Sequence, residues 1–117
     1  MKISERIEIL FSGGVIDEEV MDLTLKAVSW LEKRNISLED ERGHMFLTHF
    51  AMSLQRIKKG EQVETLDSYI MDELQNSRGY AKALDFVRFM EKQGKIQLPE
   101  SEKAYILLHL CNLFGKE

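Results

Sequence analysis

The sequence has little cysteine and no excess of basic residues, and each shortage excludes a class of protein. Its single cysteine, Cys111, cannot form an internal disulfide, which favours the reducing cytoplasm as its compartment. The net charge of −4 supplies no broad basic surface, so direct binding of nucleic acid is not expected. The first ten residues include Glu5, Arg6 and Glu8, a composition that predicts neither a signal peptide nor a membrane segment.

The composition is that of one folded domain. Of the 117 residues, 44% are hydrophobic and 31% are charged, which is too apolar for a disordered chain. A chain of this length can bury one core but not two, so we expect a single domain over residues 1–117. Two glycines follow the first helical stretch, so residues 1–14 could form an N-terminal arm.

Apolar residues recur at helical spacing, which predicts an all-α fold. We expect a compact helical bundle of about five principal helices plus an N-terminal helix. The capping pattern Ser37-Leu38-Glu39-Asp40 would open the third helix, and Gly60 would end it. Tyr69 is assigned to the apolar stripe of the following helix. A short first helix with Ile3, Ile7 and Leu10 on one face is expected before Gly13-Gly14, and the later helices are expected over about residues 17–35, 39–59, 65–76, 80–93 and 100–114.

Two histidines have positions that could matter for chemistry. His49 flanks the main apolar stripe of the third expected helix, in line with Met45, Met52 and Arg56. Periodicity alone favours a half-buried structural histidine at this position.

His109 lies in a last helix that is apolar almost all round. Tyr105 and Asn112 are four residues before it and three after it, within hydrogen-bonding reach on the same face. Here too, the pattern alone favours a satisfied core histidine over a reactive one.

No other pattern predicts catalysis or metal binding. His44 is expected to be a solvated residue of the first helical turn, about 140° around the helix from His49. Cys111 faces away from His109 and is expected to be a small core residue. We therefore expect no metal, no cofactor and no enzymatic activity.

Two segments together favour a reactive role over a purely structural one for His49 and His109. The first is Leu47-Thr-His-Phe-Ala-Met-Ser-Leu-Gln-Arg56, followed by Gly60; the second runs from Gly94 through Glu102, Ile106 and His109 to Asn112. They resemble the two histidine motifs of the PTS regulation domain, or PRD, a module of bacterial transcriptional antiterminators and activators. The resemblance covers about residues 17–114 in the right order and spacing.

The resemblance implies a regulator that senses the sugar phosphotransferase system. It implies that His109 and His49 accept phosphate, that Asn112, Arg56 and Tyr105 support them, and that the donor is phosphorylated HPr or an enzyme IIB. It further implies a symmetric homodimer acting through protein contacts, with the two histidines on one side of the bundle.

The sequence departs from the family pattern in two places. Thr48 stands where the family usually has aspartate, and Ala104 stands where the second motif usually has glycine. A carboxylate before His49 could orient its imidazole, so Thr48 favours an alternative in which the fold is kept without phosphorylation. That alternative is a plain helical interaction or assembly module, or an accessory subunit of an enzyme.

Overall fold

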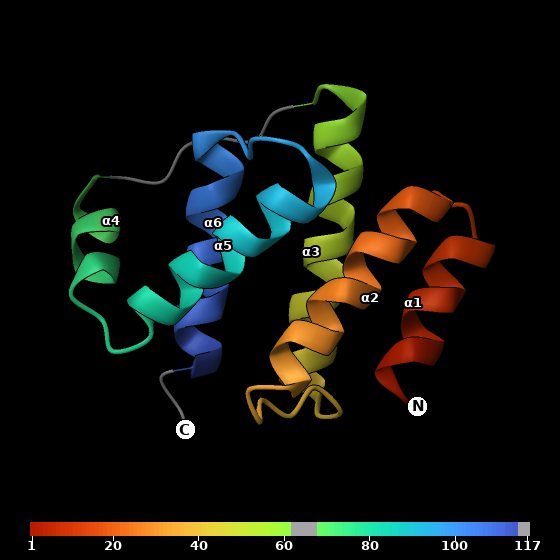
Figure 1. Ribbon diagram of the computed structural model, residues 1–117, viewed down its shortest axis with the longest axis horizontal. Coiled ribbons are helices and arrows are strands. Elements are labelled where there is room, and N and C mark those ends of the chain that lie inside the picture. Colours follow the sequence, from red (N-terminus) through yellow and green to blue (C-terminus); the bar gives the residue numbers. More distant parts are fainter. Residues whose placement is uncertain (62–67, 115–117) are drawn as a thin grey trace. The chain divides into compact units, whose positions relative to one another are not determined.

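The computed structural model describes residues 1–61 and 68–114, which contain six helices and no strand (Figure 1). The all-α prediction is therefore confirmed over the described residues. The chain divides into two units, residues 1–60 and residues 61–117, and each holds three helices in its described part.

The first unit is a set of three mutually packed helices. These are α1 (Ile3–Ser12), α2 (Glu18–Glu32) and α3 (Glu41–Lys59), and each contacts the other two (Figure 1). The helix expected at the N-terminus is thus α1, which is packed on α2 and α3 through a face that includes buried Ile3 and Ile7. Helix α2 buries a stripe at helical spacing: Val20, Leu23, Ala27, Trp30 and Leu31.

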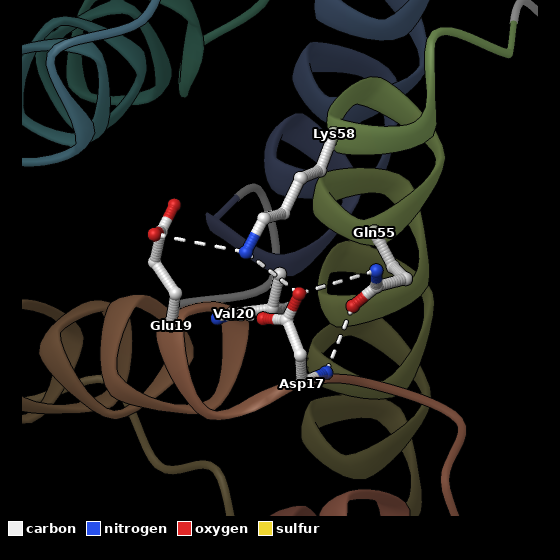
Figure 2. Close-up of polar contacts among 5 residues, drawn as sticks. All are labelled: Asp17, Glu19, Val20, Gln55 and Lys58. Atoms are coloured by element: carbon white, nitrogen blue, oxygen red, sulfur yellow. Dashed lines mark hydrogen bonds and ion pairs between the residues drawn. The ribbon is translucent and has the colours of Figure 1, made fainter.

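A polar cluster joins the start of α2 to the last turns of α3 (Figure 2). Asp17 is the N-cap of α2, and its carboxylate accepts a hydrogen bond from the Val20 N–H at 2.9 Å. The Asp17 N–H donates to Gln55 Oε1 at 2.9 Å, and Lys58 Nζ lies 2.7 Å from Asp17 Oδ2. Glu19 lies 3.6 Å from the same ammonium. These contacts fix α2 against the helix that carries His49.

The ion pair between Asp17 and Lys58 shifts the pKa of each side chain in the direction that favours its charged form. The hydrogen bond from Lys58, followed by that from the Val20 N–H, lowers the pKa of the Asp17 carboxyl below its ordinary value. The same bond to Asp17 raises the pKa of Lys58. Both side chains remain partly exposed to water, so the pair is screened and contributes little to stability.

The start of α3 differs from the prediction. The N-cap is Asp40, whose carboxylate accepts from the Gly43 N–H at 2.8 Å, so the predicted capping box beginning at Ser37 is wrong. The reason is tertiary. A Cβ added to Gly43 would lie 2.5 Å from the Cα of Leu38, which shows how closely α3 approaches the preceding segment. Leu38 itself is 1% exposed, so its burial sets where the helix can begin. At the other end, Gly60 is the left-handed C-cap, as predicted.

The second unit is built around α6. It contains α4 (Ser68–Gln75), α5 (Tyr80–Gly94) and α6 (Glu100–Phe114), and α6 contacts both other helices. The predicted start of α4 near residue 65 lies outside the described residues. Tyr69 is exposed on α4, so its assignment to the buried stripe is wrong, whereas Leu74 is buried. An eight-residue helix has only two turns, and one of its predicted apolar positions faces water.

Two contacts fasten α5 to α6. At one end, a Cβ on Gly79 would lie 2.8 Å from the Cβ of Phe114, so the start of α5 touches the end of α6. At the other end, the Glu91 carboxylate accepts from the Leu98 N–H at 2.8 Å, and Lys103 of α6 lies 3.9 Å from it. The segment between α5 and α6 is thereby held at both sides, and α6 begins directly after Pro99.

Candidate functional site

His49 lies on an exposed face of α3. Its neighbours along that face are Met45 and Met52, which are 51% and 38% exposed, four residues before it and three after it. Two exposed methionines beside an exposed imidazole make an apolar surface that a protein partner can cover. The adjoining side of α3 is buried through Phe46 and Phe50, whose stacked rings have centroids 5.8 Å apart. The structural interpretation of His49 as half-buried is therefore wrong about its burial.

The residues that flank His49 on α3 have distinct environments. Arg56, two turns further on, is half-buried, and its Nη2 donates to the Oγ of buried Ser53 at 2.9 Å. This bond holds the guanidinium close to α3. The hydroxyl oxygen of Thr48 is buried and has no hydrogen-bond partner within the part of the chain that the structure describes. Thr48 therefore does not accept a hydrogen bond that would orient the His49 imidazole, as an aspartate at this position could.

His109 is half-buried in the middle of α6. Tyr105, one turn earlier, is also half-buried, while Asn112 is exposed near the end of the helix. The neighbours of His109 that point inward are buried: Ile106, Leu107 and Leu110 have 3% or less of their surface exposed. His109 thus sits where an otherwise apolar helix meets solvent. Cys111 is buried, as expected for a small core residue.

His44 is not solvated as the sequence suggested. Its side chain is 13% exposed, and its Nε2 lies 3.7 Å from Oε1 of Glu39. The same glutamate oxygen accepts a hydrogen bond from the Ile3 N–H at 2.8 Å, so it also anchors the first residue of α1. Sequence periodicity could not find this arrangement, because Glu39 precedes the helix and is itself bonded by Ile3, 36 residues earlier.

The described residues give no sign of a metal centre or a membrane segment. No group of three or more histidine, cysteine, aspartate or glutamate side chains in the described ranges could hold a metal ion. None of the described helices is long and apolar enough to cross a bilayer. An open hollow of about 530 Å³ on α1 is lined by Glu5, Glu8, Ile9, Ser12 and Gly13, and it contains none of the predicted site residues.

Comparison with known proteins places this helical chain in a family. The PRD domain family matches residues 15–113, a range that includes both candidate histidines. The chain belongs to the PRD domain family. Its residues 1–14, which contain α1, precede the matched range.

The PRD domain has a bacterial relative of similar length. It is 28% identical over 110 residues to the uncharacterized protein YhfY of Escherichia coli strain K12, covering 93% of this chain and 92% of that protein. No solved structure matches the chain significantly. The PRD domain is a regulatory type of domain.

Proposed function

We propose that this PRD domain is a cytoplasmic regulator that senses the state of the sugar phosphotransferase system through phosphorylation of histidine. The observation that carries the proposal is the family match over residues 15–113, because it includes both histidine motifs in order. His109 is the favoured acceptor and His49 the second. The output is a change in protein contacts that influences transcription, without direct binding of nucleic acid.

The chemistry requires little from the protein. The lone pair of a neutral imidazole nitrogen forms a bond to phosphorus, while the bond from phosphorus to the donor side chain breaks and its electron pair returns to the donor atom. The second ring nitrogen keeps its proton during the transfer. Phosphorylated HPr or an enzyme IIB is the proposed donor, and no cofactor is needed. The partial exposure of His109 and the exposure of His49 are compatible with access by such a protein.

The supporting residues have separate proposed roles. Asn112 and Tyr105 flank His109 on α6 and are proposed to fix its tautomer, leaving the other ring nitrogen to attack. Arg56 lies seven residues, or two helical turns, after His49 on α3 and is proposed to attract a phosphate there.

The phosphorylation test uses the purified protein with active phosphocarriers and measures acid-labile phosphate. Wild type is compared with His49→Ala, His109→Ala and His44→Gln, the last being a histidine outside both motifs. Loss of label only in His109→Ala is the expected result. Loss only in His49→Ala would transfer the assignment to His49. A folded wild-type protein that takes no label from active donors would refute the proposal.

We also propose a symmetric homodimer. Met45 and Met52 form an exposed apolar pair on α3, and such surfaces commonly mark protein contacts. A phosphate at a dimer interface would have to supply about 5 kcal/mol of differential interaction to reverse the assembly equilibrium. Light scattering at tens of micromolar should give twice 13.6 kDa, and Met52→Lys should lower it. A wild-type mass of 13.6 kDa would contradict the dimer.

A second candidate function is favoured by Thr48. Without a carboxylate before His49, the domain would be an interaction or assembly module that retains the fold, or an accessory subunit of an enzyme. Under this alternative, wild-type protein takes no label at either histidine. Under the phosphorylation proposal, Thr48→Asp increases the label on His49.

A further inference from the structure

A buried carboxylate lies on the helix that carries His109. Glu102 is 0% exposed, and it is the one charged side chain of the described residues that is fully buried. Removing a carboxylate from water is costly, so a buried one must be compensated by its surroundings. Its neighbour Glu100, in the same turn of α6, is 84% exposed. Glu100 can therefore serve as the exposed control for the buried Glu102.

Helix capping does not account for the burial of Glu102. The carbonyl of Pro99 accepts from the Lys103 N–H at 2.8 Å, which makes Pro99 the N-cap and Glu102 the third residue of α6. A glutamate at this position usually accepts from the N–H of the N-cap residue. Proline has no N–H, so that bond cannot form. The helix dipole favours negative charge at this end, but it does so for exposed Glu100 as well.

The position of Glu102 along α6 relates it to His109. The two residues are seven apart, which places them within about 20° of the same face and about 10.5 Å apart along the axis. Both side chains lean toward the N-terminus of α6, so the carboxylate and the imidazole keep roughly this axial separation. Glu100 is nine residues from His109 and lies on the opposite face of the helix.

We propose that Glu102 is the charge through which α6 responds to negative charge at His109. This inference rests on the proposed phosphorylation and assigns its regulatory consequence. A phosphate adds a charge of about −1.5 to −2 on the face that already carries a buried carboxylate. The repulsion acts partly through protein rather than through water, so salt screens it weakly. Phosphorylation of His109 therefore loosens the packing of α6 against α4 and α5. Glu102 is a positioning residue in this scheme and does not touch the reacting atoms.

The first test introduces charge at residue 109 genetically and needs no phosphoryl donor. His109→Asp and His109→Asn are compared by melting temperature in three backgrounds: wild type, Glu102→Gln and Glu100→Gln. We expect the His109→Asp protein to melt about 5 °C below the His109→Asn protein in the wild-type background. This difference in melting temperature should fall by at least half in the Glu102→Gln background. Glu100→Gln should leave the gap unchanged. An equal gap in the wild-type and Glu102→Gln backgrounds would overturn the inference.

A second series covers the case in which Glu102→Gln does not fold. His109→Lys, His109→Asn and His109→Asp all keep Glu102, and their melting temperatures should decrease in that order. An Asp variant as stable as the Lys variant would contradict the inference.

A third measurement separates this inference from the proposed function. Phosphorylation by the phosphocarriers should lower the melting temperature of wild type, and lower it by less than half as much in Glu102→Gln. If wild type takes up phosphate but the two proteins lose the same melting temperature, only the role of Glu102 is refuted and the phosphorylation proposal stands. Charge coupling in the genetic series, without any label on wild type, would refute the phosphorylation and leave the coupling in place.

Discussion

Replacing Gly43 with alanine tests how tightly the start of α3 is fixed. The residue is buried in the first turn of the helix, three positions after the Asp40 N-cap. A Cβ at this position would lie 2.5 Å from the Cα of Leu38 and 2.7 Å from its carbonyl oxygen. Both are backbone atoms, so no side-chain rotation can relieve the clash, and the segment around Leu38 must move away from α3.

Two effects of opposite sign decide the outcome of Gly43→Ala. Alanine is favoured over glycine inside a helix by about 1 kcal/mol. Overpacking a buried site costs about 1–3 kcal/mol, and rigid backbone neighbours place this case in the upper part of that range. The net expectation is a loss of about 1–2 kcal/mol in the free energy of unfolding. A loss of this size lowers the melting temperature by about 4–10 °C for a chain of this length.

Urea unfolding of wild type and Gly43→Ala measures this difference. The only tryptophan, Trp30, is buried in α2 and reports on the first unit by fluorescence, while circular dichroism reports on all helices. Gly13→Ala is the control, because there a Cβ would lie 3.2 Å from a single carbonyl oxygen, and it should change stability by less than about 0.5 kcal/mol. A Gly43→Ala protein as stable as wild type would show that the approach of Leu38 to α3 is not tight.

Two further predictions concern the caps and the core. Asp17→Ala should cost about 1–2 kcal/mol, mainly because it removes the cap of α2. Asp17→Asn keeps the cap and removes only the screened ion pair with Lys58, so its cost should be the smaller of the two. Because the pKa of Asp17 is lowered in the folded state, its contribution is present above the ordinary value of 3.8 and is lost as pH falls through the folded pKa. Urea midpoints from pH 5 to pH 2 should therefore fall more for wild type than for Asp17→Asn, and parallel curves would refute the ion pair. In the second unit, Phe86→Ala should cost about 3–5 kcal/mol by circular dichroism, because Phe86 is 0% exposed, and a loss below 1 kcal/mol would contradict its place in the core.

The local signals that succeeded are those complete within a few residues. Asp17 opens α2 as predicted, because its side chain needs only the N–H of Val20, three residues on. Gly60 ends α3 because a left-handed residue is needed there and glycine adopts that conformation without strain. The two histidine motifs likewise lie each within one helix, so the family could be identified from them before any contact was known.

The signals that failed depended on packing that the helical pattern does not contain. Ser37 and Asp40 both have capping side chains, and Asp40 is the N-cap where Leu38 packs beside Gly43. His44 resembles a solvated first-turn residue, but its imidazole lies beside Glu39, whose carboxylate also accepts from the Ile3 N–H at the start of α1.

The burial of Glu102 likewise depends on packing that the local sequence pattern does not contain. Sequence determined that a carboxylate and His109 share one face of a helix, since a spacing of seven residues is two helical turns. It also determined that Pro99 cannot supply the usual capping N–H. Only the tertiary structure decided that Glu102 is enclosed while Glu100 is open to water, because enclosure depends on which other segments pack around the helix and helical periodicity contains no information about them.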